Sequence, residues 1–237
     1  MRRCFFLLFV VFFAGAADAQ PSIDLLARID PEAGLDEGDG YGVAVAVEGN
    51  WAAVGASGDT YEGVSGAGSV YLYQRLGGTW RFHSRLTGSA VQPNRAFGIA
   101  LAMQGSRLVV GAPGFQTERG YVSGAVYVFE RSVADWREVA RFTSGLGDGT
   151  VGRDFAINQD RLLIGTWLGN GAAFIAERTG ATWAITDTLR GASSLVSNLD
   201  LDGDLAAIGE SRAFTPDVVI RTAADWRLGR GKQRYGP

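Results

Sequence analysis

Cysteine and histidine, which supply many reactive and metal-binding side chains, are nearly absent from this chain. Among its 237 residues, Cys4 is the only cysteine and His83 is the only histidine. A multi-histidine zinc site or a Cys–His catalytic pair is therefore excluded from the body of the protein. No disulfide can form within the chain either, so stability has to come from packing and from backbone hydrogen bonds.

Long hydrophobic runs are missing too, apart from one near the start. Residues 5–13 are apolar, follow two arginines and precede the small-residue site Ala17-Asp18-Ala19. This order predicts a secretory signal peptide over residues 1–19, cleaved after Ala19, because the run is too short to cross a bilayer. Cys4 lies ahead of the run, whereas a lipid-attachment cysteine would follow it. We therefore expect a secreted or cell-envelope protein, extracellular or periplasmic, that is not integral to the membrane.

The chain also lacks an excess of positive charge. It has 22 basic and 25 acidic residues, which gives a formal net charge of −3. A nucleic-acid-binding domain is usually strongly basic, so we expect no nucleic-acid partner.

Glycine, by contrast, is abundant, with 34 residues, and it marks an internal repeat. Four times, an aromatic-Gly pair or its remnant precedes an apolar run, a turn and a second apolar run that ends in glycine. The pairs are Tyr41-Gly42, Phe97-Gly98, Val151-Gly152 and Leu195-Val196, and the closing glycines are Gly55, Gly111, Gly165 and Gly209. A repeat of roughly 40 to 55 residues is typical of a propeller or another repeat array.

Each repeat is expected to form four strands. Short apolar runs bounded by glycine and polar pairs indicate strands, and turn-rich tripeptides such as Glu48-Gly49-Asn50 indicate tight hairpins. The predicted first strands are residues 43–47, 99–103, 153–157 and 197–201, and the fourth strands begin at Trp80, Trp136, Trp183 and Trp226. Four antiparallel strands make one propeller blade, so the sequence predicts an all-β fold: a β-propeller, partial or open, with about four blades. We assign residues 20–237 to one domain, with repeats at about 36–87, 92–143, 147–190 and 192–228.

The first strands of repeats one and two are apolar on both faces. Val43, Val45 and Val47 alternate with two alanines, so one face is bulky and the other is small. A sheet face in water would carry polar side chains, so we expect these strands to be covered on both faces by neighbouring blades.

The recurring tryptophans allow two interpretations, sugar binding and packing. A buried tryptophan removes about 150 to 250 Å² from water, which corresponds to roughly 4 to 6 kcal/mol as an upper bound. We favour packing for Trp80, Trp136, Trp183 and Trp226.

Several of these motifs resemble a known family. Phe97-Gly98 with Gly111-Ala112-Pro113, and Tyr41-Gly42 with Gly55-Ala56, are similar to the FG-GAP repeats that form the β-propeller of integrin alpha subunits and occur in many exported bacterial proteins. The resemblance implies a propeller used for binding or adhesion, often with calcium in acidic loops. Repeats three and four match the family pattern more weakly, and their assignment depends on the register that they share with the first two repeats.

The acidic loops implied by that resemblance are mostly absent. Only repeat four offers three alternating carboxylates, Asp200, Asp202 and Asp204, and these coincide with a hairpin turn. Calcium prefers six to eight oxygen ligands, so a turn with a solvated acidic edge is the favoured interpretation and a metal site the alternative. We assign no catalytic, cofactor-binding or metal-binding residues, and no cofactor.

Two hypotheses on function follow. The first is an exported, non-catalytic binding or adhesion module, whose inter-blade loops at residues 57–66 and 114–123 contact a protein or glycan ligand. The second is the scaffold of an extracellular hydrolase with paired carboxylates on the loop face.

Residues 23–29 resemble a fourth strand. Since the end blades of an open array leave faces or edges uncovered, we also expect self-association or partner binding.

Overall fold

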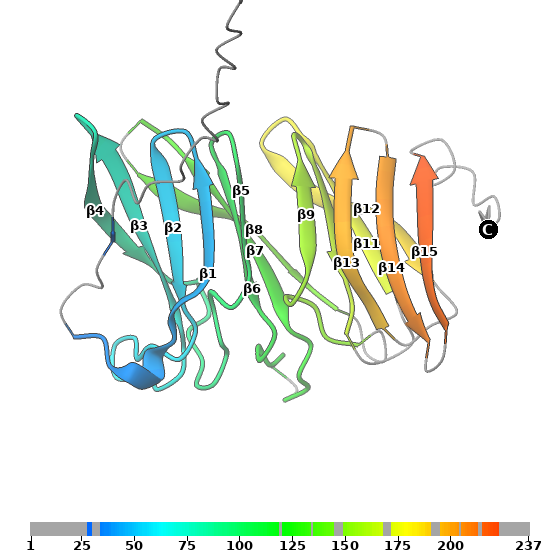
Figure 1. The fold of residues 1–237 in the computed structure, drawn as a ribbon. Helices are drawn as coiled ribbons and strands as arrows, with labels where there is room; N and C mark the ends of the chain where they lie inside the picture. Colours follow the sequence, from blue (N-terminus) through cyan, green and yellow to red (C-terminus); the bar gives the residue numbers. More distant parts are fainter. Residues whose placement is uncertain are drawn as a thin grey trace, which may run out of the picture.

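A computed structural model describes residues 28–29, 34–118, 120–133, 135–144, 149–167, 172–190, 195–203, 205–212 and 215–222. These residues form fifteen strands and one short 3-10 turn, η1 (Glu37–Asp39), so the predicted all-β class is confirmed. The strands make four antiparallel sheets in sequence order, as expected for propeller blades. Figure 1 shows the four sheets in a row that does not close, with the first blade at one end and the fourth at the other.

The strands of the four blades follow the predicted repeats. Blade 1 comprises β1 (Tyr41–Glu48), β2 (Trp51–Ala56), β3 (Ser69–Leu76) and β4 (Thr79–Leu86). Blade 2 comprises β5 (Leu101–Gln104), β6 (Arg107–Ala112), β7 (Ala125–Arg131) and β8 (Trp136–Thr143). Blade 3 comprises β9 (Phe155–Asn158), β10 (Arg161–Gly165), β11 (Ala172–Thr179) and β12 (Thr182–Arg190). Blade 4 comprises β13 (Leu195–Asp202), β14 (Leu205–Arg212) and β15 (Thr215–Thr222), while the strand predicted at Trp226 lies outside the described residues.

Each blade is a meander in which strands adjacent in sequence pair with each other. The predicted hairpins are confirmed by the pairs that close them, Glu48 with Trp51, Gln104 with Arg107, Asn158 with Arg161 and Asp202 with Leu205.

The first strands of blades 2 and 3 begin two residues later than predicted. Gly98 and Gly152 have φ angles of +93° and +98°, so the backbone is not extended just before these strands. The preceding residue Phe97 instead donates its N–H to the Ala67 carbonyl of blade 1, at 3.2 Å. Phe97-Gly98 therefore belongs to the contact between blades 1 and 2 rather than to a regular strand.

The core is divided among the junctions between successive blades. Each blade packs one face, which we call its tail face, on the head face of the next blade. Between blades 1 and 2 the buried residues include Trp51, Ala53, Val70 and Leu72 on the tail face and Phe97, Leu108, Val110 and Tyr127 on the head face. The corresponding clusters contain Val109, Val126 and Val128 against Phe155, Leu162 and Ile164, and then Leu163 and Ile175 against Leu201, Ala206 and Ile208.

The prediction that the first strands are covered on both faces is wrong for β1. Val43, Val45 and Val47 are 46%, 69% and 65% exposed. The head face of blade 1 points away from blade 2, and no sheet of the described residues packs against it. The alternation of valine and alanine in the sequence shows that this face is apolar. It does not show that blade 1 stands at the end of the row.

The packing interpretation is confirmed for two of the recurring tryptophans. Trp136 and Trp183 are 4% and 7% exposed and lie in the junctions of blade 2 with blade 1 and of blade 3 with blade 2. Trp80 is half-buried and packs on the head face of blade 1, as Ile29 also does. Trp226 lies outside the described residues, as does most of the strand expected at residues 23–29.

Candidate functional site

The two loops predicted to form a recognition surface lie at the same end of the sheets (Figure 1). Loop 1 (residues 57–68) joins β2 to β3, and loop 2 (residues 113–124) joins β6 to β7. The segment between blades 1 and 2 connects them. Its Asn94 N–H donates to the Ser65 carbonyl of loop 1 at 3.1 Å, and the Gly114 N–H of loop 2 donates to the Arg95 carbonyl at 3.0 Å. The three segments therefore form one surface, which we call the loop face.

A buried carboxylate holds loop 1. Asp59 is 3% exposed and accepts a hydrogen bond from the Tyr71 hydroxyl at 2.8 Å. The same oxygen lies 2.6 Å from Nη2 of Arg85, which also donates to the Thr60 carbonyl at 2.7 Å. Because β3 and β4 supply both partners, these contacts fix the loop to the sheet and satisfy a charge that would be costly to bury alone.

The aromatic rings around Arg85 complete this anchor. Its guanidinium carbon lies 4.9 Å from the ring centre of Tyr61 and 5.6 Å from that of Tyr71, within the range of a cation–π contact. Burial, followed by the hydrogen bond to Asp59, raises the pKa of the Tyr71 hydroxyl well above its usual value. Tyr71 therefore remains a hydrogen-bond donor throughout the neutral range.

A buried arginine holds the connecting segment. Arg95 is fully buried, and no carboxylate of the described residues pairs with it. Its Nη2 donates to the Thr87 hydroxyl at 2.6 Å, its Nη1 donates to the Ala90 carbonyl, and its Nε donates to the Ala67 carbonyl at 3.4 Å. Burial lowers the pKa of this guanidinium, while the backbone carbonyls and the Phe97 ring, 4.9 Å away, compensate for lost hydration.

Loop 2 is a small hairpin that exposes two large side chains on its second arm. Thr117 donates its N–H to the Tyr121 carbonyl at 2.9 Å, and Gln116 bridges to Val122. The Gln92 side chain bonds both the N–H and the carbonyl of Gln116 at 2.9 Å. Tyr121 and Val122 are nevertheless 53% and 52% exposed. The loop thus displays large side chains from a backbone that is held in place.

Comparison with known families agrees with this architecture. A family model described as FG-GAP repeat matches residues 33–73 and 80–129, which include Tyr41-Gly42, Phe97-Gly98 and most of the loop face. The chain is an FG-GAP repeat protein. Its first two repeats carry the match, and blades 3 and 4 continue the same strand order.

One solved structure similar to this FG-GAP repeat protein is the crystal structure of the computationally designed Ika4 protein. The TM-score is 0.51 at 15% sequence identity, and the alignment covers 82% of this chain and 96% of that chain. At this identity the similarity concerns the fold alone. No curated protein matches the sequence.

The other residues considered from the sequence for catalysis or metal binding are His83 and the aspartates of repeat four. His83 packs edge-on against Trp51, with 4.8 Å between the ring centres. Asp200 and Asp202 lie at the end of β13, and Asp204 falls outside the described residues. Within the described ranges there is no group of three or more His, Cys, Asp or Glu side chains that could hold a metal ion. The same ranges contain no helix that is long and apolar enough to span a membrane.

Sequence reasoning identified the loops but missed the residues that hold them. Asp59, Arg85 and Arg95 resemble the solvated charges that are common in loops and at strand ends. Their placement depends on partners 5 to 32 positions away in the sequence, such as Ala90 and Tyr127 for Arg95. No local pattern in the sequence indicates these pairings.

Proposed function

We propose that this FG-GAP repeat protein is an exported, non-catalytic binding module that contacts a protein or glycan ligand through its loop face. The proposal depends on one observation: Tyr121 and Val122 are exposed on one arm of a hairpin loop whose backbone is held by its own hydrogen bonds and by Gln92. A surface that is already ordered loses little conformational entropy on binding, and a tyrosine provides a large contact area with few rotatable bonds.

The hydrolase alternative finds less support on the loop face. Among the described loop residues the carboxylates are Asp59, Glu62 and Glu118, and Asp59 is already bound to Arg85 and Tyr71. Glu62 and Glu118 are both exposed. An acid catalyst usually needs a partly buried setting, which neither glutamate has.

Binding is tested with the purified chain on glycan and secreted-protein arrays, followed by titration of any ligand found. We expect saturable binding that weakens at least about tenfold in a Tyr121→Ala, Val122→Ser variant, because the apolar contact area is lost. Val133→Ser, which changes a fully exposed valine outside the loop face, is the matched control and should bind normally. Turnover of glycosides or phosphoesters that is abolished by Glu62→Gln or Glu118→Gln would instead establish the hydrolase.

Export is tested separately. The N-terminal sequence of the protein recovered from the culture medium or periplasm should begin at Gln20. Retention of residues 1–19 on protein that stays in the cytoplasm would contradict the predicted cleavage and the predicted location.

A further inference from the structure

The junction between blades is one interface that this chain forms three times. At each junction the tail face of one blade packs on the head face of the next. The second strands align by their closing glycines, so Trp51, Ala53 and Gly55 of β2 correspond to Leu205, Ala207 and Gly209 of β14. The two ends of the row therefore carry the two halves of this interface.

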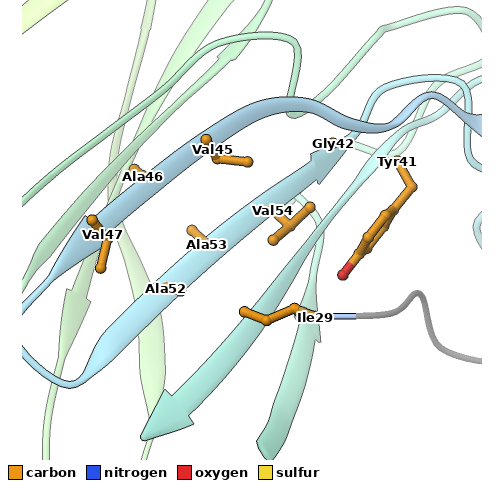
Figure 2. A pocket seen from close by; sticks show the side chains of 9 residues that line it. All are labelled: Ile29, Tyr41, Gly42, Val45, Ala46, Val47, Ala52, Ala53 and Val54. Atoms are coloured by element: carbon orange, nitrogen blue, oxygen red, sulfur yellow. The ribbon is translucent and has the colours of Figure 1, made fainter. Parts of the chain in front are cut away.

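The head half is uncovered on blade 1. Val45, Val47 and Phe82 are 69%, 65% and 43% exposed. Ile29, Tyr41 and Val54 lie toward one end of an apolar groove of about 380 Å³ and Val47 toward the other (Figure 2). Exposed apolar surface of this kind on a sheet usually marks an interaction site.

Gly42 shows that this face has the geometry of an occupied junction. Its φ of +88° is close to those of its counterparts Gly98 (+93°) and Gly152 (+98°). A Cβ on Gly98 would lie 2.7 Å from the Ser69 carbonyl oxygen of blade 1, and one on Gly152 would lie 2.5 Å from that of Ala125 in blade 2. A Cβ on Gly42 would meet nothing within 4 Å. Blade 1 thus has the backbone that receives a preceding tail face, and that place is open.

On blade 4 the described residues of the tail half are exposed or part-exposed. Leu205 is 49% exposed, and Ala207 and Gly209 are part-exposed. The neighbouring Asp200 and Asp202 of β13 pair with Ala207 and Leu205 and are exposed on the same face. A carboxylate next to a first strand is compatible with a junction, because Asp154, just before β9 of blade 3, accepts the Leu199 N–H of blade 4 at 3.2 Å.

We propose that the tail face of blade 4 docks on the head face of blade 1 of a second copy of this chain. The contact repeats the three internal junctions and covers the apolar surface at both ends of the row. Because it joins two different surfaces, it either closes a ring or extends into a chain of copies. A head-to-head contact would bury the valines as well, but it would leave Leu205 uncovered and would bring no tail face to Gly42.

The proposal is tested by sedimentation velocity on the full-length chain over a concentration series. We expect association, and we expect both Val45→Asp on the head and Leu205→Asp on the tail to move its midpoint to at least about 100-fold higher concentration, since each buries an unpaired charge. Val133→Asp, the same change at a fully exposed valine, is the control and should associate like the wild type.

Mixing the two variants gives the decisive measurement. The tail face of the Val45→Asp chain and the head face of the Leu205→Asp chain are both intact, so an equimolar mixture should form a heterodimer although neither variant associates alone. That recovery would also show that both variants are folded. A wild-type chain that stays monomeric up to about 100 μM, or a Leu205→Asp chain that associates normally, would overturn the proposal.

Discussion

Gly55 and Gly98 meet where blade 1 packs on blade 2, and neither has room for a side chain. A Cβ on Gly55 would lie 2.0 Å from the carbonyl oxygen of Gly98. Gly111 and Gly152 repeat this contact between blades 2 and 3, again at 2.0 Å. The glycine that closes each second strand and the glycine of the next aromatic-Gly pair are therefore two sides of one backbone contact, which explains why they recur together.

Gly55→Ala should lower the free energy of unfolding by about 3 kcal/mol or more, because the added methyl group meets backbone that cannot rotate away. Gly38→Ala is the control, since its Cβ would meet nothing within 4 Å. We expect that change to stay within about 1 kcal/mol of the wild type. Denaturant unfolding measures both, and equal effects would contradict the close approach.

Asp59→Asn should weaken the anchor of loop 1 and lower the free energy of unfolding by about 2 to 3 kcal/mol. Breaking a fully buried ion pair costs about 3 to 5 kcal/mol, and the 30% exposure of the Arg85 side chain reduces this. Hydrogen exchange should speed up at the amide of Gly68, which donates to the Asp59 carbonyl. Glu62→Gln, an exposed change in the same loop, should alter stability by less than about 0.5 kcal/mol. Equal exchange in the two variants would argue against the anchor.

Asp154→Asn should change how stability depends on pH. Burial raises the pKa of the Asp154 carboxyl, although backbone N–H groups, including that of Leu199, partly oppose the shift. The folded chain therefore holds this proton more tightly than the unfolded chain, and wild-type stability should fall as pH rises from about 4 through the raised pKa. The amide can still accept a hydrogen bond from the Leu199 N–H but does not titrate. The stability of the variant relative to the wild type should therefore increase as the pH rises over that range. Urea titrations between pH 3.5 and 7 check this, with Glu48→Gln as the exposed control. A difference in the free energy of unfolding between variant and wild type that does not vary with pH would contradict this prediction.

Trp136→Ala should lower the free energy of unfolding by about 3 to 5 kcal/mol, as expected for a large aromatic side chain removed from a core. Its ring lies edge-on to Trp51 with 5.5 Å between the centres, in the junction of blades 1 and 2. Trp80→Ala should lower the free energy of unfolding by roughly half as much in dilute solution, because Trp80 is half-buried on the open head face. The comparison is made at concentrations too low for association. An equal loss from the two variants would mean that the head face of blade 1 is covered within a single chain.

The sequence alone determined the repeat, the blades and their hairpins. Alternation with a period of two residues marks the strands, and turn-forming pairs such as Gly49-Asn50 mark their ends, because both signals act over a few neighbouring residues. The contrast between bulky Val45 and small Ala44 and Ala46 also showed that blades stack by unlike faces.

The tertiary structure decided what depends on distant partners. It placed Asp59 and Arg95 in the interior, and it assigned Phe97-Gly98 to a blade contact instead of a strand. It also left the valines of β1 exposed, although the corresponding residues of β5 lie within a junction. Burial is a property of position in the row of blades, and a repeated local pattern is the same at the end of the row as in its middle.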